Sequence, residues 1–560
     1  MANPADAMNA TAKPALPDGP ASAADSKTVH LPLSPGVWPG ALPGLPFTVP
    51  PAGPHPNRDH LIDLWLDEQI WGHRLWDGQS PWLIFLEFLN VAEACQRRGR
   101  LLTDEVPYPL RYRPRQRLFL RNILFNSDDV GRIADEFGDS RRAWEAWLAR
   151  IQETARGVPQ RDFSYLVPRF HSYHDFVEAV RLLRGAVVER QSNKRWSSRF
   201  VFPFGAHALY IDLNITAAGQ PSREYINFGR SGELLYLMLA RSSFRDALAP
   251  YVSAMVSGTN RWDRLVASLQ PDGEDDQERE SKSCYLPYRQ HPVFEGLARD
   301  WLAMFRMGLP SFEVYPRLVT LGAFHLVRYH LSVASTWAGA DGLPYLVCEI
   351  VAPKKTLVRE VSLRTYGQND AVSTNAVEQF VDRIRGSDAW RSAESSGAFV
   401  QCRQVLKEAV WWGDRYEGPN DPGVLLVELR RAALKGHQQH VAHVHRTYGR
   451  EIGLVSRRGT TRFRYAPTDQ LIKTLLFATV EHRMEFGEFL DSLFDKYRLV
   501  IGAREAERVL PPDEFDFRAF QANARRLEQR LDSLGLLCRL SDACAYVENP
   551  YRRADAWRQS

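Results

Sequence analysis

Arginine side chains gather near the C-terminal end of the chain at spacings that suit contact with phosphate. In residues 517–534, FRAFQANARRLEQRLDSL, apolar side chains recur every three or four positions, which predicts a helix with one buried face. That face comprises Phe517, Phe520, Ala524, Leu527, Leu531 and Leu534. The opposite face carries Arg518, Gln521, Asn523, Arg525, Arg526, Gln529 and Arg530. Guanidinium groups fork onto phosphate oxygens, and Gln521 and Asn523 suit adenine edges, so this face predicts duplex-DNA contact with weak sequence preference.

A second basic segment precedes this helix. Residues 454–465, LVSRRGTTRFRY, have the pattern of a hairpin that turns at Arg-Gly-Thr, and aromatic side chains are interleaved with the basic ones. The arginines expected to add phosphate contacts are Arg457, Arg458, Arg462 and Arg464. For both basic segments a solvated surface or a protein-docking surface stays open as an alternative.

One arrangement suggests metal-dependent phosphodiester hydrolysis. Asp421 precedes residues 422–431, PGVLLVELRR, which we interpret as a buried strand that carries Glu428 and Arg430. Nucleases of the PD-(D/E)xK type place an acid before a strand with Glu-x-Lys, in order to hold a divalent metal and polarise a water. Here Arg430 stands where the lysine is expected, and arginine stays charged. A divergent nuclease is therefore an alternative function rather than the favoured one.

The histidines at 437, 440 and 443 raise a metal-binding hypothesis. On a helix, His437, His440 and His443 drift along one side, but no H-E-x-x-H pattern or nearby paired acid completes a site. Exposed or interface histidines are the favoured interpretation, and no cofactor is expected.

Composition and absent sequence motifs exclude several classes of protein. The sequence has no G-x-x-x-x-G-K-[ST], so no nucleotide is expected at a P-loop, and it has no G-x-G-x-x-G or G-x-S-x-G. The most apolar helix candidate, residues 81–95, is short and contains Glu87, so no membrane span is predicted. Six cysteines occur singly without a C-x-x-C pair, which favours a reducing cytoplasm. A net charge of +4 demands no nucleic-acid partner by itself.

The elements that would position these residues form a mainly α, multidomain chain with an α/β or α+β middle region. Strands are predicted within 199–215, 343–352 and 422–431, and most other periodic segments are helical. Three helices within 467–534 and a hairpin over 536–547, with Arg539 on it, follow the order of a winged helix. The predicted divisions are a disordered Pro/Ala-rich leader (1–56), a mostly helical domain with a few strands (57–270), an acidic loop (271–283), an α/β or α+β domain that ends in the basic hairpin (284–465), and a winged-helix domain (466–560).

Three stretches carry a family resemblance: INFGRSGELLYLMLARS, YPRLVTLGAFHLVRYHLSVA and RRLEQRLDSLGLLCRLSDACAYVENPY. Over most of residues 57–551 the chain resembles accessory components of bacterial multigene antiphage defence systems of the methylation-associated type. The resemblance implies a non-enzymatic subunit that contacts duplex DNA or bridges other subunits of a defence complex. A bridging subunit without DNA contact remains the alternative from the same resemblance.

Overall fold

The computed structural model describes residues 62–551 with gaps. The gaps are residues 73–74, 104–109, 111, 126, 128, 159–160, 186–204, 210–212, 216–220, 224–229, 258–259, 273–285, 341–342, 354, 411, 413–415, 458–461 and 542–543. The predicted leader and most of the predicted acidic loop therefore lie outside the described residues.

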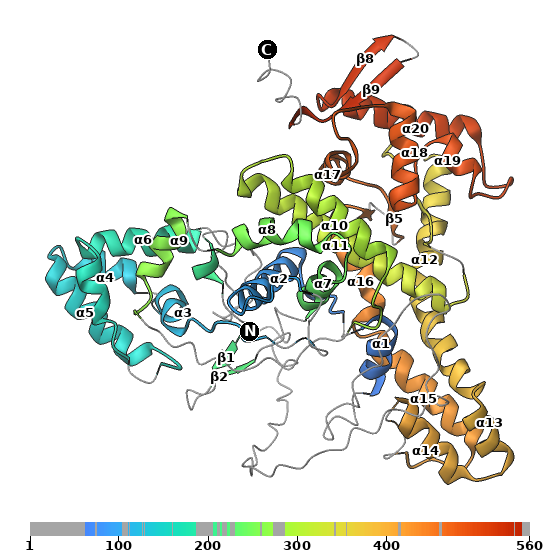
Figure 1. The fold of residues 1–560 in the computed structure, drawn as a ribbon, viewed down its shortest axis with the longest axis horizontal. Helices are drawn as coiled ribbons and strands as arrows, with labels where there is room; N and C mark the ends of the chain where they lie inside the picture. The colour runs from blue at the N-terminus through green and yellow to red at the C-terminus, as the bar shows by residue number, and fades with distance from the viewer. Residues whose placement is uncertain are drawn as a thin grey trace, which may run out of the picture.

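The centre of the molecule is a bundle of apolar helices (Figure 1). It contains α1 (Ile62–Trp71), α2 (Pro81–Gln96), α7 (Ser231–Ala240), α10 (Pro292–Phe305), α11 (Ser311–Trp337) and α16 (Val444–Glu451). Helix α7 is buried along its whole length against α2, and Gly232 permits the approach because a Cβ there would overlap the carbonyl oxygen of Ile84. The mainly helical fold class is confirmed. Among the described helices, none is both long and apolar enough to cross a membrane.

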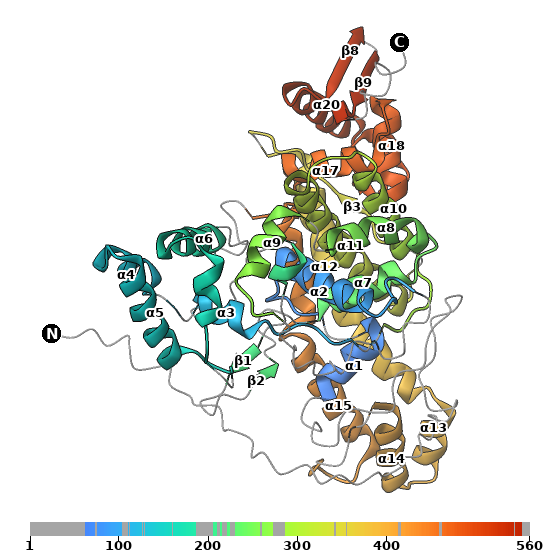
Figure 2. The same cartoon turned by 60° about the vertical axis from the view of Figure 1, so that its left-hand side comes forward.

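A helical lobe extends from the bundle, on the left in both ribbon views (Figures 1 and 2). Its core is aromatic, with Trp144, Trp147 and Phe176 in mutual contact. The lobe and the segments that join it to the bundle comprise α3 (Leu118–Phe125), α4 (Val130–Glu136), α5 (Ser140–Thr154), η3 (Ser164–Arg169), α6 (Tyr173–Gly185), η5 (Ala206–Ala208), the antiparallel pair β1 (Leu213–Ile215) and β2 (Pro221–Arg223), α8 (Arg245–Met255) and α9 (Arg261–Ser268).

A second extension is helical where the sequence predicts a strand. It is built from α12 (Leu357–Arg385), α13 (Asp388–Ser395), α14 (Phe399–Val410), α15 (Pro422–His437) and η6 (Val441–His443). The strand predicted for 422–431 is wrong, because these residues form the first part of α15. The carboxylate of Asp421 accepts a hydrogen bond from the backbone N–H of Val424 at 2.9 Å, and Pro422 occupies the first helical position.

The strands of the middle region are only two residues long. β3 (Leu346–Val347) pairs in parallel with β7 (Leu499–Val500), and β4 (Val455–Ser456) pairs with β5 (Arg464–Tyr465) in antiparallel register. The α/β or α+β character predicted for 284–465 is thus wrong in extent, since helices dominate there. The two strands of the basic hairpin are present, and its turn lies outside the described residues.

The C-terminal unit stands at the upper right of Figure 1. It comprises α17 (Asp469–Thr479), β6 (Arg483–Glu485), α18 (Phe486–Tyr497), β7, α19 (Ala503–Glu507), α20 (Phe517–Ser533), β8 (Leu537–Ser541) and β9 (Cys544–Glu548). β9 lies between β6 and β8 and is antiparallel to both.

Candidate nucleic-acid interface

Helix α20 presents one polar stripe to solvent. Asp516 caps the helix by accepting a hydrogen bond from the backbone N–H of Ala519 at 3.0 Å. One face of the helix is buried through Phe520, Leu527 and Leu531, so the opposite face is exposed to solvent. The exposed residues of α20 are Phe517, which is predicted on the buried face, Asp532, Ser533, and the stripe Arg518, Gln521, Arg525 and Gln529, whose members follow helical steps of three and four. Among the described residues, none of these four side chains has a hydrogen bond or an ion pair.

Gln529 belongs to this stripe, as its place on the polar face predicted from the sequence indicates. Its position four residues after Arg525 is the signal that places it on the same line of the helix. The stripe therefore contains two arginines and two glutamines.

Asn523 does not belong to the exposed face, which corrects its predicted role as a base reader. Its side chain is fully buried and accepts a hydrogen bond from the backbone N–H of Ile350 at 2.8 Å. Its amide donates to the carbonyl oxygens of Cys348 and Ile501, each at 2.9 Å. Three satisfied backbone groups make Asn523 a structural residue of the C-terminal unit.

Three other predicted phosphate contacts are engaged within the protein. Arg530 forms an ion pair with Asp469, and Arg539 on β8 pairs with Glu528 at 2.6 Å. Arg526 is half-buried and lies 3.5 Å from the amide oxygen of Asn523. A phosphate group would have to compete with these intramolecular partners, so these arginines are weaker candidates than Arg518 and Arg525.

The basic hairpin divides into buried and exposed arginines. Arg464 is buried in an ion pair with the fully buried carboxylate of Glu349, so its predicted phosphate contact is not compatible with this structure. Arg457 and Arg462 are exposed, and the guanidinium of Arg457 lies 5.6 Å from the ring centre of Phe463. Arg458 lies outside the described residues.

The nuclease-like residues lie on a helix and are held by ordinary helix contacts. Asp421 is the cap of α15, Glu428 pairs with Arg431 at 2.6 Å, and Arg430 pairs with Asp382. On a strand the residues i and i+2 share one face, whereas on a helix they point about 160° apart. The geometry required for a Glu-x-Lys metal site is therefore lost.

The histidines predicted as a cluster do not share a partner: His437 and His440 contact different acids. His437 Nδ1 lies 2.9 Å from Asp67, its Nε2 lies 3.1 Å from Ser373 Oγ, and its ring stacks on Trp71. His440 bonds Asp77 at 2.8 Å, and His443 is half-buried, with its pKa lowered by burial. Within the described part of the chain, no group of three His, Cys, Asp or Glu side chains is arranged to hold a metal ion.

Hydrogen bonds link Asp67, His437 and Ser373 in the same sequence as the acid, histidine and serine of a hydrolytic triad. These side chains are buried, so a substrate cannot reach them. Each of the three side chains is at most 1% exposed. A nucleophilic serine needs an open approach for the reacting carbonyl, so this chain of hydrogen bonds joins α1, α12 and α15 as a structural network.

A buried network that the sequence does not reveal anchors the C-terminal unit to the bundle. The carboxylate of Asp300 contacts His325 Nε2 at 2.7 Å and accepts a hydrogen bond from the hydroxyl of Tyr497 at 3.0 Å. Burial lowers the pKa of His325 and raises the pKa of Tyr497 well above its ordinary value. Arg328 donates to the carbonyl oxygen of Lys496, which fixes the end of α18 against α11.

In comparisons with known proteins, no protein-family model, curated protein or solved structure matches the chain.

Proposed function

We propose that this chain is a cytoplasmic DNA-binding subunit, whose C-terminal unit is a winged helix that lays α20 in the major groove. The observation that carries the proposal is the exposed stripe Arg518, Gln521, Arg525 and Gln529, whose side chains have no partner among the described residues. Arginine donates to guanine and to phosphate, and glutamine pairs with adenine, so all four side chains are of types that contact DNA.

The arrangement of the C-terminal unit supports this reading. In a winged helix, a first helix and strand precede a helix pair, and two final strands form the wing. Here α17, β6, α18, α20, β8 and β9 follow that order, and β6 pairs with β9 as the first strand does in that fold. The unit departs from the simplest plan because β7 and α19 lie between α18 and α20.

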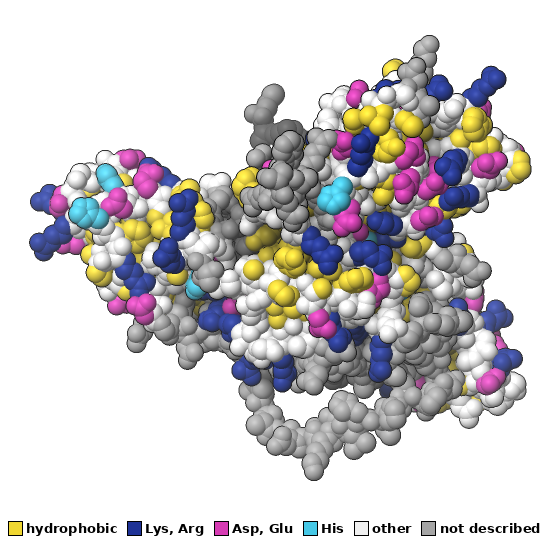
Figure 3. Space-filling view, turned by 45° about the horizontal axis from the view of Figure 1, so that its top comes forward, with side chains coloured by type: hydrophobic (Ala, Val, Ile, Leu, Met, Phe, Trp, Pro, Cys, Tyr) yellow, Lys and Arg dark blue, Asp and Glu magenta, His cyan; other side chains and the backbone are white. Residues whose placement is uncertain are grey.

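The dimensions of the stripe suit a groove. From Arg518 to Gln529 the helix rises about 16 Å at 1.5 Å per residue, which spans roughly five base pairs at 3.4 Å each. On the face drawn in Figure 3, acidic and basic side chains are interspersed over the C-terminal unit. The proposed contact is therefore narrow, and the expected affinity is modest and sensitive to salt.

A salt series tests the proposal. Binding of a fluorescent duplex would be followed by anisotropy for the wild type and for the double variant Arg518→Gln/Arg525→Gln. Two lost phosphate contacts should reduce the slope of log affinity against log salt by about 1.8. The matched control is Arg504→Gln/Arg508→Gln, which removes the same charge from exposed arginines of the same unit that pair with Asp491. Equal loss in both double variants, or no duplex binding by the folded wild type, would refute the assignment to α20.

A scaffolding role is the second candidate, and exposed apolar side chains favour it. Val400 on α14 and Val424 and Val427 on α15 are exposed on neighbouring helices. In the antiphage defence complex implied by the sequence resemblance, these residues would contact another subunit. Val424→Glu with Val427→Glu should then reduce co-purification with the products of neighbouring genes and leave duplex affinity unchanged.

A further inference from the structure

The exposed face of α20 has an uncharged part as well as a charged one. Apart from Ser533, whose hydroxyl donates to the carbonyl oxygen of a residue in the preceding turn, the uncharged exposed side chains are Phe517, Gln521 and Gln529. Phe517 is 55% exposed at the first position of the helix, and among the described residues its ring contacts no other aromatic ring. Gln521 lies four residues later, so the two side chains are neighbours on the helix surface.

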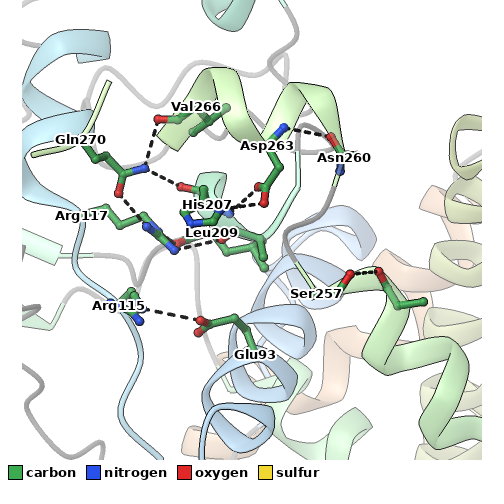
Figure 4. A network of polar contacts seen from close by, with 12 residues as sticks. Glu93, Arg115, Arg117, His207, Leu209, Ser257, Asn260, Asp263, Val266 and Gln270 are labelled. Carbon is green, nitrogen blue, oxygen red and sulfur yellow. Dashed lines mark hydrogen bonds and ion pairs between the residues drawn. The ribbon is translucent and has the colours of Figure 1, made fainter. Parts of the chain in front are cut away.

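A carboxamide that serves the fold uses both its donors and its acceptor, as Gln270 does (Figure 4). The amide nitrogen of Gln270 donates to the carbonyl oxygen of His207 at 3.1 Å, and its oxygen accepts a hydrogen bond from Arg117 at 2.6 Å. The amides of Gln521 and Gln529 have no such partners within the part of the chain that the structure describes. Their donors and acceptors therefore stay available to a ligand.

Adenine is the base whose major-groove edge matches a carboxamide. Its N6 amino group donates and its N7 accepts, side by side, so one glutamine side chain can bond both atoms at once. Thymine, the partner of adenine, places its methyl group in the same groove, where an apolar side chain such as phenylalanine contacts it. Gln521 and Gln529 therefore favour adenine, Phe517 favours thymine, and all three favour A·T base pairs.

The spacing of these side chains sets where the favoured base pairs lie. From Gln521 to Gln529 the helix rises about 12 Å, or roughly three to four base pairs. From Phe517 to Gln521 it rises about 6 Å, or roughly two base pairs. The exposed carboxylate of Asp532, three residues beyond Gln529, would repel a phosphate, so the contact ends there.

We propose that the site on α20 is selective for A·T-rich duplex DNA, which Gln521 and Gln529 read at adenine edges and Phe517 at a thymine methyl group. This inference rests on the DNA contact proposed above and assigns its base selectivity to side chains other than the arginines. Arg518 and Arg525 hold phosphates and supply the dependence on salt, whereas the uncharged side chains supply the preference for particular base pairs.

Changes made in the DNA test this selectivity without altering the protein. Anisotropy with the full chain would compare an A·T-rich duplex with a G·C-rich duplex of equal length and with two altered forms of the first. 7-Deazaadenine removes the N7 acceptor, and uracil in place of thymine removes the methyl group, while both keep base pairing and the minor-groove edges. The G·C-rich and 7-deazaadenine duplexes should raise the Kd of the wild type about fivefold or more. The uracil duplex should raise it about fourfold for one buried methyl group.

Matched variants assign each effect to a side chain. Gln521→Ala/Gln529→Ala should bind the adenine and 7-deazaadenine duplexes equally, and Phe517→Ala should bind the thymine and uracil duplexes equally. Neither change removes a charge, so the slope of log affinity against log salt should equal that of the wild type. Gln368→Ala and Phe312→Ala, at exposed positions on α12 and α11, should respond to each altered duplex as the wild type does.

The outcomes separate the selectivity from the DNA contact itself. Equal affinity for A·T-rich and G·C-rich duplexes would overturn the selectivity and leave the contact standing. A preference for A·T that survives both altered bases would come from the shape of the minor groove and would also overturn it. The same holds if the α20 variants lose the preference no more than their controls. No binding of any duplex by the folded wild type would refute the contact and the selectivity together.

Discussion

The side-chain amide of Asn523 donates to the carbonyl oxygen of Cys348, 175 residues earlier in the chain, at 2.9 Å. Cys348 follows β3, which pairs with β7 of the C-terminal unit, so one side chain of α20 closes the end of this small parallel sheet. The helix proposed to contact DNA is thereby fixed to the body of the protein by its buried side, while its exposed side stays available.

Asn523→Ala should destabilise the protein without touching a DNA contact. The change leaves the backbone groups of Ile350, Cys348 and Ile501 without their buried partner, which should lower the free energy of unfolding by about 3 kcal/mol. Urea unfolding measures this. Gln521→Ala, on the exposed side of the same helix, should stay within about 0.5 kcal/mol of the wild type. Unchanged stability in Asn523→Ala would show that these hydrogen bonds do not hold the helix.

The buried ion pair between Arg464 and Glu349 should show strong coupling. Arg464→Met leaves a fully buried carboxylate without its cation and should cost about 3–5 kcal/mol of stability. Glu349→Met/Arg464→Met removes both charges and should be more stable than the single variant, because no unpaired charge remains buried. Denaturation of the wild type, both single variants and the double variant completes the cycle, and additive losses would contradict the coupling.

Acid should destabilise the fold through His291. Burial, with a smaller contribution from Arg328, lowers the pKa of His291 from 6.5 to about 4. Between those values the unfolded chain binds the proton and the folded chain does not. The free energy of unfolding should therefore fall by about 3 kcal/mol as the pH decreases from 6.5 to 4.

His291 also caps α10, because its Nδ1 accepts a hydrogen bond from the backbone N–H of Val293. A variant that isolates the titration of His291 must therefore keep this cap. Asn is a favoured cap that does not titrate, so His291→Asn should flatten the dependence of stability on pH in this window. His171→Asn, at an exposed position, should leave it unchanged. A slope in His291→Asn equal to that of the wild type would assign the acid sensitivity to other groups.

Asp421 should matter to helix stability and not to metal chemistry. Asp421→Ala removes the cap of α15 and should cost about 1 kcal/mol, whereas Asp421→Ser keeps a capping oxygen and should cost less. Metal-dependent cleavage of DNA, assayed for the wild type, Asp421→Ser and Glu428→Gln, should show no difference among the three. A cleavage activity that both substitutions abolish would restore the nuclease hypothesis.

The helices were predictable where apolar residues repeat every three or four positions, and the main failure came from a short apolar run. In residues 422–431, Val, Leu and Leu stand together, which fits a buried strand or a buried helix equally well. The preceding Asp421 and Pro422 are the signal that distinguishes them, because an acid followed by proline is a typical helix start. Strands β3, β4 and β5 fall within segments that the sequence predicts as strands, but each is only two residues long, and no sequence pattern connects β3 with its distant partner β7.

The candidate sites were predictable only to the level of a helix face. The outward line through Arg518 and Arg525 follows from periodicity alone. The burial of Asn523 does not, because its partners at 348 and 350 are distant in the chain. The same holds for His207, whose carboxylate partner Asp263 lies 56 residues away and has no local motif to mark it.

Helix α12 runs from beneath the C-terminal unit to the outer helices α13 and α14 (Figure 1). Its first turns share an apolar cluster with α20, which includes Val358, Val361 and Phe520. With 29 residues it is about 44 Å long, so each degree of tilt at its first turn displaces its far end by about 0.8 Å. The helix thus connects the packing of α20 to the outer helices, and a tilt of its first turn would be amplified at α13 and α14.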